Sequence, residues 1–367
     1  MYRRLAGVPL ILLALLLDAS DARPALAQAW PPFVLVAGLL LIGLVAGRDG
    51  LFDAAASRLV GLPGPPVALL LACLALVAVV TALLNLDTAA VFLTPVLIGV
   101  ARRRGVDVVP FLYGSIFMVN ASSLFLPGSN LTNLLVLSGE HVSGGSFFAR
   151  MLPMALAAPL ITAVGLVLIH RRRLLAGGER ELERPTALRL GLGFWGGLFA
   201  AVLIIALRNA ALPVLALGLV LVALRARRGA LAWGETLSWL GAPVLVSLFG
   251  LAVALGTVAR ASAFPAAVVH SAGRPLTAAV AALASVVVNN LPAAVLLSSA
   301  PPRHPGALLL GLNVGPNLAV TGSLSVLLWW RAAHAAGATP SALAYSRQGL
   351  VLTPLAIVGA LAVGALL

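Results

Sequence analysis

Long apolar stretches follow one another along almost the whole chain, and this pattern limits the folds that it can adopt. Only 10% of the 367 residues are charged, too few to cover a core that faces water. The outer surface must therefore face lipid, where every backbone polar group needs an internal partner. We predict an all-α polytopic membrane protein with about ten spans. The apolar stretches lie near 5–17, 33–47, 67–84, 89–101, 108–118, 131–138, 151–169, 190–207, 211–224, 236–258, 276–288, 291–300, 306–330 and 350–367.

Arginine sets the predicted orientation. The chain has 24 arginines and no lysine, and they cluster between apolar stretches without interleaved aromatic residues, which argues against a nucleic-acid partner. Placing the clusters inside makes 18 of the 24 arginines cytoplasmic. The positive-inside rule then predicts a multi-pass protein of the bacterial inner membrane, with a cytoplasmic N-terminus and an external C-terminus. The six arginines assigned to the outside are Arg23, Arg150, Arg208, Arg260, Arg274 and Arg303.

Two segments contain apolar stretches that are too short to be ordinary spans. A helix over 89–101 is about 20 Å long, whereas the hydrocarbon layer is about 30 Å thick. Both flanks of 67–101 are cytoplasmic in the arginine pattern, so we predict a re-entrant hairpin with its tip, Asn85–Thr88, inside the membrane. Both flanks of 276–300 are external, which predicts a second hairpin with its tip at Asn289–Pro292.

The order of the parts repeats in the two halves of the chain. Each half has two spans, a hairpin, a polar span broken by Gly or Pro, and a final span; the broken spans are 108–138 and 306–330. We predict two inverted repeats, 1–189 and 211–367, joined by a linking span at 190–210. Paired interrupted segments of opposite orientation point to a transport site at the repeat interface.

The first 28 residues allow a second interpretation. Arg3 and Arg4, the apolar stretch 5–17 and the segment Ala25-Leu26-Ala27 also resemble a cleavable signal peptide. The repeat model needs 5–17 as a first span, so we keep this segment in the mature protein.

Polar residues gather at the hairpin tips and in the broken spans, at membrane depth. Broken backbone is tolerated there only where it is buried in protein or lines a cavity. Asn and Ser both donate and accept hydrogen bonds, which suits a neutral hydroxylated solute or a partly dehydrated ion. The alternative is that single asparagines only join helices. The predicted substrate-binding residues are Asn85, Asp87, Thr88, Asn120, Ser122, Ser123, Ser129, Asn130, Asn289, Asn290, Asn313, Gly315, Asn317, Thr321 and Ser323.

Asp87 is the only acidic residue in the stretch 67–101. A carboxylate inside a membrane is costly and marks a functional site by default. We therefore predict that Asp87 couples transport to protons. The competing interpretation is that Asp87 only caps the returning limb of the hairpin, because Asp suits a helix N-terminus.

Cofactors and catalysis are not indicated. The single cysteine, Cys73, lies in an apolar stretch, and no His, Cys and Glu residues have the spacing of metal ligands. The spans hold no pair of catalytic acids and no nucleophile with a base. We predict no metal, no cofactor and no enzymatic activity.

The polar segments resemble those of the bacterial arsenite efflux permeases, which belong to the ion transporter superfamily with the divalent anion–sodium symporters. The resemblance runs through most of the chain, and its second-half signature is the most specific part. The segments that carry it are 87–95 (Asp-Thr-Ala-Ala-Val-Phe-Leu-Thr-Pro), 120–123 (Asn-Ala-Ser-Ser), 129–133 (Ser-Asn-Leu-Thr-Asn), 289–292 (Asn-Asn-Leu-Pro), 311–317 (Gly-Leu-Asn-Val-Gly-Pro-Asn) and 321–324 (Thr-Gly-Ser-Leu).

The resemblance implies an elevator-type carrier that exports arsenite or antimonite in exchange for protons. Its candidate partners are the solute, a coupling proton or sodium ion, the lipid bilayer, a second copy of the chain and a soluble ATPase. The chain departs from the family at Asn120 and Asn313, where some members carry Asp, and at the first tip, where Leu86 separates an Asn and an Asp that are often adjacent. These departures leave Asp87 as the predicted coupling residue.

Other functions compete with metalloid export. A sodium- or proton-coupled carboxylate or anion carrier, or a sodium–proton antiporter, can use the same fold, although the Ser-Asn-Thr tip motifs of the carboxylate branch are absent. A membrane-embedded enzyme would need catalytic groups that the spans lack. Arsenous acid is neutral near pH 7, and a site of amides with one carboxylate fits it, so arsenite export is the leading prediction.

Overall fold

The computed structural model describes residues 7–138, 142–176, 190–229, 234, 236, 240–262 and 264–366. These residues form helices and no strands, as expected where the backbone must satisfy its own polar groups in lipid. The helices are α1 Gly7–Leu17, α2 Ala19–Arg48, α3 Leu51–Val60, α4 Pro66–Leu83, α5 Leu86–Arg103, α6 Val108–Ala121, η2 Pro127–Ser129, α7 Leu131–Leu137, α8 Gly144–Leu175, α9 Leu192–Ala206, α10 Ala211–Arg227, α12 Ala242–Ser262, α13 Phe264–Ser271, α14 Arg274–Val288, α15 Asn290–Leu297, α16 Pro305–Val314, η3 Gly315–Leu318, α17 Leu324–Ala335 and α18 Ala342–Leu366.

Five of the described helices, α2, α4, α8, α12 and α18, are long and apolar enough to cross a membrane. The expected first span at 5–17 differs from the structure. Its helix α1 has 11 residues and is about 16 Å long, shorter than the hydrocarbon layer. Asp18 then caps α2 by accepting hydrogen bonds from the Ser20 and Asp21 amides, and α2 runs for 30 residues. The first long helix therefore includes the proline-rich segment before 33–47.

The stretch predicted as the first hairpin forms α4 and α5, which are separated at Leu84 and Asn85. The guanidinium of Arg104, after α5, donates to the carbonyls of Val60 (3.1 Å) and Gly64 (3.2 Å), before α4. The start of α4 and the end of α5 therefore lie close together. Although α4 is long enough to cross a membrane by itself, the chain turns back at its end.

Helix α5 lies very close to α2, because two glycines of α2 leave room for it. A Cβ on Gly43 would lie 2.7 Å from Thr88 Cγ2, and a Cβ on Gly47 would lie 2.7 Å from Phe92 Cε1. The glycines are four residues apart on α2, and Thr88 and Phe92 are four apart on α5. The two helices therefore meet along one face of each.

The stretch predicted as the second hairpin forms α14 and α15, and Asn289 separates them. Asn289 has φ of +78°, and among the described residues it is the one with positive φ that is not glycine. Its Nδ2 donates to the carbonyl of Thr321 (3.0 Å), and the Asn290 amide donates to the carbonyl of Gly322 (2.9 Å). These bonds hold the strained tip against the break before α17.

Two further helices are interrupted, as expected from the polar spans 108–138 and 306–330. Helix α6 ends at Ala121, and after η2 the chain continues as α7. Helix α16 ends at Val314, and η3 and an extended segment precede α17. Gly315 lies so close to α14 that a Cβ there would be 2.5 Å from Ala282 Cα. Glycine and proline thus produce the interruptions and allow close packing beside them.

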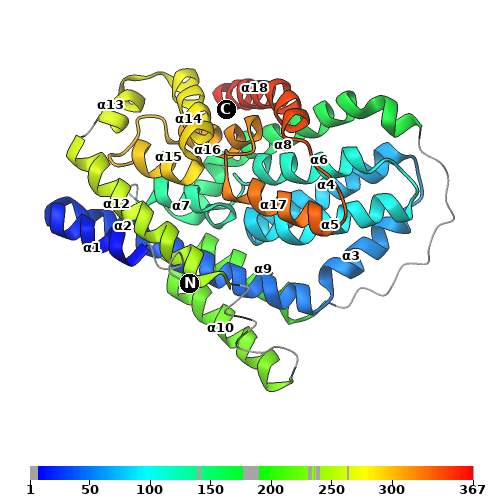
Figure 1. The fold of residues 1–367 in the computed structure, drawn as a ribbon, viewed down its shortest axis with the longest axis horizontal. Coiled ribbons are helices and arrows are strands. Elements are labelled where there is room, and N and C mark those ends of the chain that lie inside the picture. Colours follow the sequence, from blue (N-terminus) through cyan, green and yellow to red (C-terminus); the bar gives the residue numbers. More distant parts are fainter. Residues whose placement is uncertain are drawn as a thin grey trace.

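The predicted linking span 190–210 contains α9, which packs with α10 along α2 (Figure 1). Asp49, at the end of α2, accepts a hydrogen bond from the Gly193 amide (2.8 Å) and forms an ion pair with Arg225. The side chain of Asp49 is 1% exposed, so Arg225 is needed to balance its charge. This contact places the start of α9 and the end of α10 beside the same end of α2.

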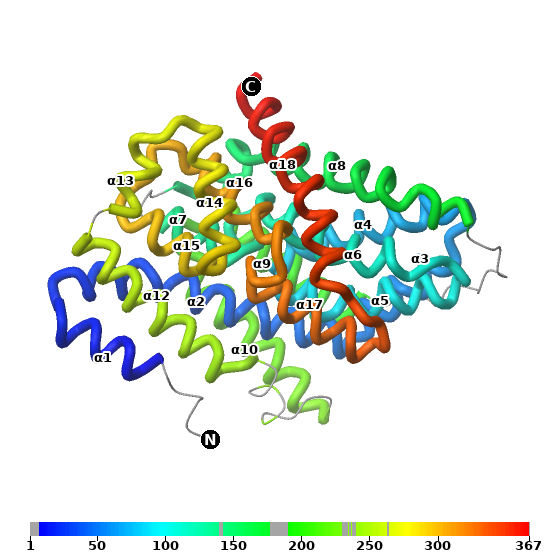
Figure 2. Tube along the Cα trace, turned by 45° about the horizontal axis from the view of Figure 1, so that its top comes forward, coloured from blue at the N-terminus to red at the C-terminus, as the bar shows by residue number. Residues whose placement is uncertain are grey.

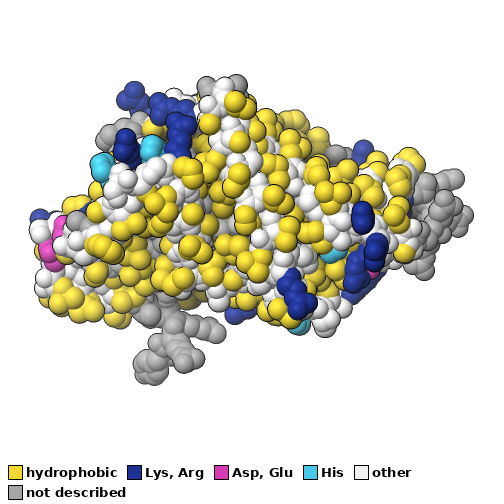
Figure 3. Space-filling view, turned by 90° about the horizontal axis from the view of Figure 1, so that it is seen from above, with side chains coloured by type: hydrophobic (Ala, Val, Ile, Leu, Met, Phe, Trp, Pro, Cys, Tyr) yellow, Lys and Arg dark blue, Asp and Glu magenta, His cyan; other side chains and the backbone are white. Residues whose placement is uncertain are grey.

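Several helix ends meet at what we call the arginine-rich end of the molecule. Arg102 of α5 donates to the carbonyls of Ala336 (2.6 Å) and Gly337 (2.8 Å) after α17. Near the end of α8, Arg173 pairs with Asp107 (2.6 Å) and His170 lies 2.9 Å from Gln348 of α18. Helices α8 and α18 extend away from this end (Figure 2). On the face shown in Figure 3, groups of basic side chains are separated by a largely hydrophobic surface, which fits a membrane belt.

The orientation can be tested by labelling single cysteines in intact cells, on a Cys73→Ala background, because Cys73 is fully buried. We expect a cysteine at Leu62, between α3 and α4, to be protected from an impermeant reagent added outside. We expect a cysteine at Ser271, before α14, to react. Both side chains are exposed, so the side of the membrane on which each one lies decides the labelling. Labelling of both sites from one side would contradict the inverted repeats 1–189 and 211–367, which stay a prediction. The predicted cytoplasmic residues 177–189 lie outside the described residues.

Candidate functional site

Asn313, near the end of α16, lies at the centre of a buried polar cluster. Its Oδ1 accepts hydrogen bonds from Ser123 Oγ (2.5 Å) and Asn130 Nδ2 (2.6 Å). Its Nδ2 donates to Asn133 Oδ1 and to the carbonyl of Leu309, both at 2.8 Å. The two donor and two acceptor positions of the amide are all occupied. Asn313 therefore joins α16 to both sides of the interruption between α6 and α7.

A second amide pair extends the cluster. Asn120 Nδ2 donates to Asn317 Oδ1 (2.8 Å), and Asn317 Nδ2 donates to the carbonyl of Phe117 (3.2 Å). Tyr345 of α18 donates to the carbonyl of Pro316 (3.0 Å), which fixes η3 from the other side. We call the following residues the amide cluster: Asn120, Ser123, Asn130, Asn133, Asn313 and Asn317.

The amide cluster is buried and uncharged. Each of its side chains is at most 4% exposed. Its hydrogen-bond partners among the described residues are amides, hydroxyls and backbone carbonyls, and none carries a formal charge. Buried polar groups are costly when unpaired, so a solute entering the cluster must replace these bonds with its own. The arrangement suits a small solute that both donates and accepts.

Asp87 lies in the first turn of α5 but does not cap it. Asn85 is the cap residue, and its Oδ1 accepts the Thr88 amide at 2.7 Å. The carboxylate of Asp87 instead accepts a hydrogen bond from Ser325 Oγ of α17, at 2.5 Å. Asp87 therefore connects the tip of the first hairpin to the second broken helix.

Polar atoms near Asp87 are left unpaired. Asn85 Nδ2 and Thr88 Oγ1 are buried and have no hydrogen-bond partner within the described residues. Unpaired buried donors are rare in proteins, and one explanation is a bound water or solute. These two atoms and Asp87 form the second polar group of the site, at the first hairpin tip.

Five of the fifteen predicted site residues enter the amide cluster, and the others do not. At the second tip, Thr321 donates to the carbonyl of Val286 (3.0 Å), and Ser323 caps α17. Asn289 and Asn290 hold that tip in place, as described above, and Gly315 allows close packing. Ser122 donates to the carbonyl of Met118 within α6, and Ser129 donates to the carbonyl of Ala82 in α4 (3.1 Å). Gly315 and the side chains named in this paragraph fix the backbone around the amide cluster.

Sequence reasoning missed three residues that contact the predicted set. Asn133 is three residues after Asn130, on the same face of α7, so helical spacing could have identified it. Ser325 is one of many serines in apolar segments, and no local signal pairs it with a residue 238 positions earlier. Tyr345 lies near the start of α18 and carries no pattern that indicates a site.

A cleft of about 470 Å³ lies beside the interruption between α6 and α7. It is lined by α2, by α7 and by the connection between α9 and α10, and Pro127 of η2 forms part of its wall. Gln28 of α2, next to the lining residue Ala27, donates to the carbonyls of Leu135 (3.0 Å) and Ser298 (3.3 Å). Its Oε1 accepts from Arg260. The cleft provides space next to the segment that carries Asn130.

Relatives of the chain are membrane proteins, and two of them are named as arsenical pumps. The arsenical pump membrane protein of Yersinia enterocolitica is 26% identical over 359 residues, which cover 88% of this chain and 83% of that protein. The protein of the same name in Escherichia coli K12 is 25% identical over 362 residues, with the same coverage. A 46 kDa membrane protein of Mycobacterium leprae is 22% identical over 366 residues, covering 89% of this chain and 84% of that protein.

A solved structure shares the fold. The YdaH transporter of Alcanivorax borkumensis, described as having an unusual topology, superposes with a TM-score of 0.57 at 15% identity and covers 94% of this chain and 87% of its own. The likeness confirms the all-α polytopic membrane fold. The family model that describes citrate transporters matches residues 3–316. Together with the relatives, this match confirms the resemblance seen in the motifs and the absence of an enzymatic role. The chain belongs to the citrate transporter (CitMHS) family of membrane transporters.

Proposed function

We propose that this chain is a secondary transporter that exports arsenite or antimonite in exchange for protons. The observation that carries the proposal is the amide cluster, which offers donors and acceptors but no charge to a solute. Arsenous acid is a small neutral molecule with three hydroxyl groups, so it can replace the hydrogen bonds that the cluster makes to itself. The similarity to arsenical pump membrane proteins supports this choice of solute.

The proposed coupling residue is Asp87. Its carboxylate is bonded to Ser325 across the contact between the first hairpin and α17, so its protonation state bears on how these elements fit together. No cationic side chain bonds to Asp87 among the described residues. A proton is then the simplest charge that can neutralise the carboxylate during transport.

The proposed mechanism is of the elevator type. The hairpins and the broken helices hold the polar residues, while α2, α9, α10 and α12 form a separate layer beside them (Figure 1). Within this proposal, α4–α7 and α14–α18 move with the solute against that layer. The inverted relation of the two halves would place equivalent paths on the two sides of the membrane.

A carboxylate carrier is the second candidate, because the matching family is described as citrate transporters. A tricarboxylate carries several negative charges and needs cationic partners when it leaves water. The partners of the amide cluster include no arginine in the described residues. A cation bound with the solute would have to supply that charge, which makes this candidate the weaker one.

Transport assays separate the two candidates. We expect expression in an efflux-deficient host to lower the accumulated arsenite and raise the resistance of the cells. The matched control is the Asn313→Ala variant at equal expression, which lacks the central amide of the cluster. Unchanged arsenite accumulation together with ion-dependent uptake of citrate or succinate would replace the first candidate with the second.

A further inference from the structure

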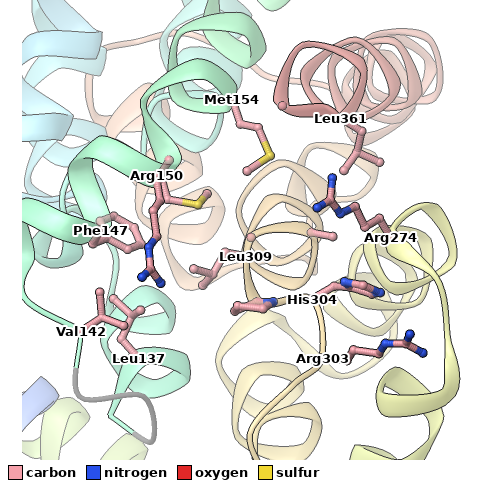
Figure 4. A pocket seen from close by; sticks show the side chains of 15 residues that line it. Leu137, Val142, Phe147, Arg150, Met154, Arg274, Arg303, His304, Leu309 and Leu361 are labelled. Carbon is pink, nitrogen blue, oxygen red and sulfur yellow. The ribbon is translucent and has the colours of Figure 1, made fainter. Parts of the chain in front are cut away.

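A cleft of about 270 Å³ lies where α8 begins and α18 ends, at the opposite ends of these helices from the arginine-rich end. Four basic side chains line it. Figure 4 shows Arg150 of α8 on one side, and Arg274, His304 and Arg303 on the other, with Leu309 between them. The two sides come from segments more than a hundred residues apart in sequence. The fold therefore brings these charges together around one space.

The charges around this cleft are not balanced within the described residues. Arg150, Arg274 and Arg303 form no ion pair there, and no Asp or Glu lines the cleft. Elsewhere in the protein, Arg173 and Arg225 each pair with an aspartate. Like charges held around one space repel each other, and an anion between them would remove that repulsion.

The remaining walls are apolar, and a helix begins at the cleft. Phe147, Met151, Met154 and Leu361 face the space beside the guanidinium groups. Helix α16 starts at Pro305 in the lining and has ten residues, so its N-terminal end adds partial positive charge. Apolar walls lower the local dielectric and strengthen the attraction between an arginine and an anion.

We propose that Arg150, Arg274 and Arg303 bind an oxygen-rich anion, a phosphate, sulfate or carboxylate group. The anion reaches the cleft either as a free solute or as the headgroup of an anionic phospholipid, whose chains would lie on the apolar walls. Arginine suits this role because its planar guanidinium donates two parallel hydrogen bonds to such groups. This site is distinct from the amide cluster and would exist whatever solute the cluster carries.

His304 gives the site a pH dependence. Burial, and then the charges of Arg303 and Arg274, hold the pKa of His304 below its ordinary value, so the ring is neutral near pH 7. Arg150 faces it from α8, and the lining residues of α7 and α18 carry no titratable group. Protonation adds a positive charge, so the affinity for an anion of constant charge should rise as the pH falls through the pKa of His304.

The test for a free anion is calorimetry with sulfate, whose charge is constant from about pH 5 to pH 8, on purified protein in an uncharged detergent. Arg150→Gln and Arg303→Gln should each weaken sulfate binding about tenfold, as expected for a charge-assisted hydrogen bond. Arg23→Gln, an exposed arginine of α2 outside the cleft, should leave binding unchanged. His304→Gln should keep binding near pH 7 but remove its increase toward pH 5.

The test for a lipid headgroup uses nanodiscs of phosphatidylcholine with and without phosphatidylglycerol. Phosphatidylglycerol should raise the Tm of the wild type and of Arg23→Gln more than that of Arg150→Gln and Arg303→Gln. Sulfate binding that depends on the cleft arginines identifies a free anion, and a lipid effect alone identifies a headgroup. The proposal is wrong if neither probe distinguishes the cleft variants from the wild type. It is also wrong if Arg23→Gln loses as much sulfate affinity or lipid stabilisation as the cleft variants do.

Discussion

Asp87→Asn is expected to reduce proton-driven arsenite export in proteoliposomes to the background rate. Asn has the same size as Asp and can still accept the hydrogen bond from Ser325, so the contact between α5 and α17 persists. Asn cannot bind or release a proton, however, and the pH gradient should no longer drive transport. Exchange of arsenite across the membrane without a gradient should be retained, because the amide cluster is unchanged.

Ser325→Ala is the matched control for this variant. It removes the partner of Asp87 but keeps the carboxyl group, so coupling should persist with a displaced pH profile. As a mere helix cap, Asp87 would be replaced well by Asn, but the cap of α5 is Asn85. Wild-type rates and pH dependence in Asp87→Asn would therefore eliminate Asp87 as the coupling residue.

Asn313→Ala should cause the largest loss at the amide cluster. The substitution removes four hydrogen bonds at once. It leaves Asn130 Nδ2 and Asn133 Oδ1 without a partner among the described residues, while Ser123 Oγ keeps its bond to the Asn120 carbonyl. We expect the affinity for arsenite to fall by roughly ten- to hundredfold, corresponding to about 1.5–3 kcal/mol. Initial rates of export against arsenite concentration, in vesicles with equal amounts of protein, measure the change.

Ser122→Ala separates a binding role from a general effect of polar residues. Ser122 is equally buried and lies next to Ser123, but it bonds only within α6. We expect this variant to transport arsenite with nearly normal affinity. If Asn313→Ala is poorly expressed or unfolds but the protein that remains has normal affinity, Asn313 only joins helices.

The interruptions of the helices could be predicted because few residue types interrupt an apolar helix. Asn85, Asn289 and the Gly315–Pro316 pair each stand inside a long apolar stretch, and each lies at a break in the structure. Asn120, Asn130 and Asn313 are predicted to share one site because each lies in a broken span, and their side chains enter the amide cluster. The partner of each amide could not be predicted, because partners come from helices that are far apart in sequence.

The length of the first helices was harder to predict. Hydropathy marks only the apolar part of a helix, and Arg23 with three prolines lowers it in the first half of α2. The boundary is set by Asp18, which caps α2 and ends the preceding stretch. Capping residues therefore locate the start of this span better than hydropathy does.

The contact between α2 and α5 has a consequence for how far the two helices can shift. Gly43 and Gly47 have no side chains and lie one turn apart on α2. Thr88 contacts Gly43 and Phe92 contacts Gly47, with the same spacing on α5. A displacement of α5 by one turn, about 5.4 Å, would bring Phe92 onto Gly43, which also lacks a side chain. The spacing thus defines discrete registers, in the manner of a ratchet, with a barrier between them. A valine at Gly43 would collide with Thr88 in the register described here and with Phe92 in the shifted one, so it would push the two helices apart in both.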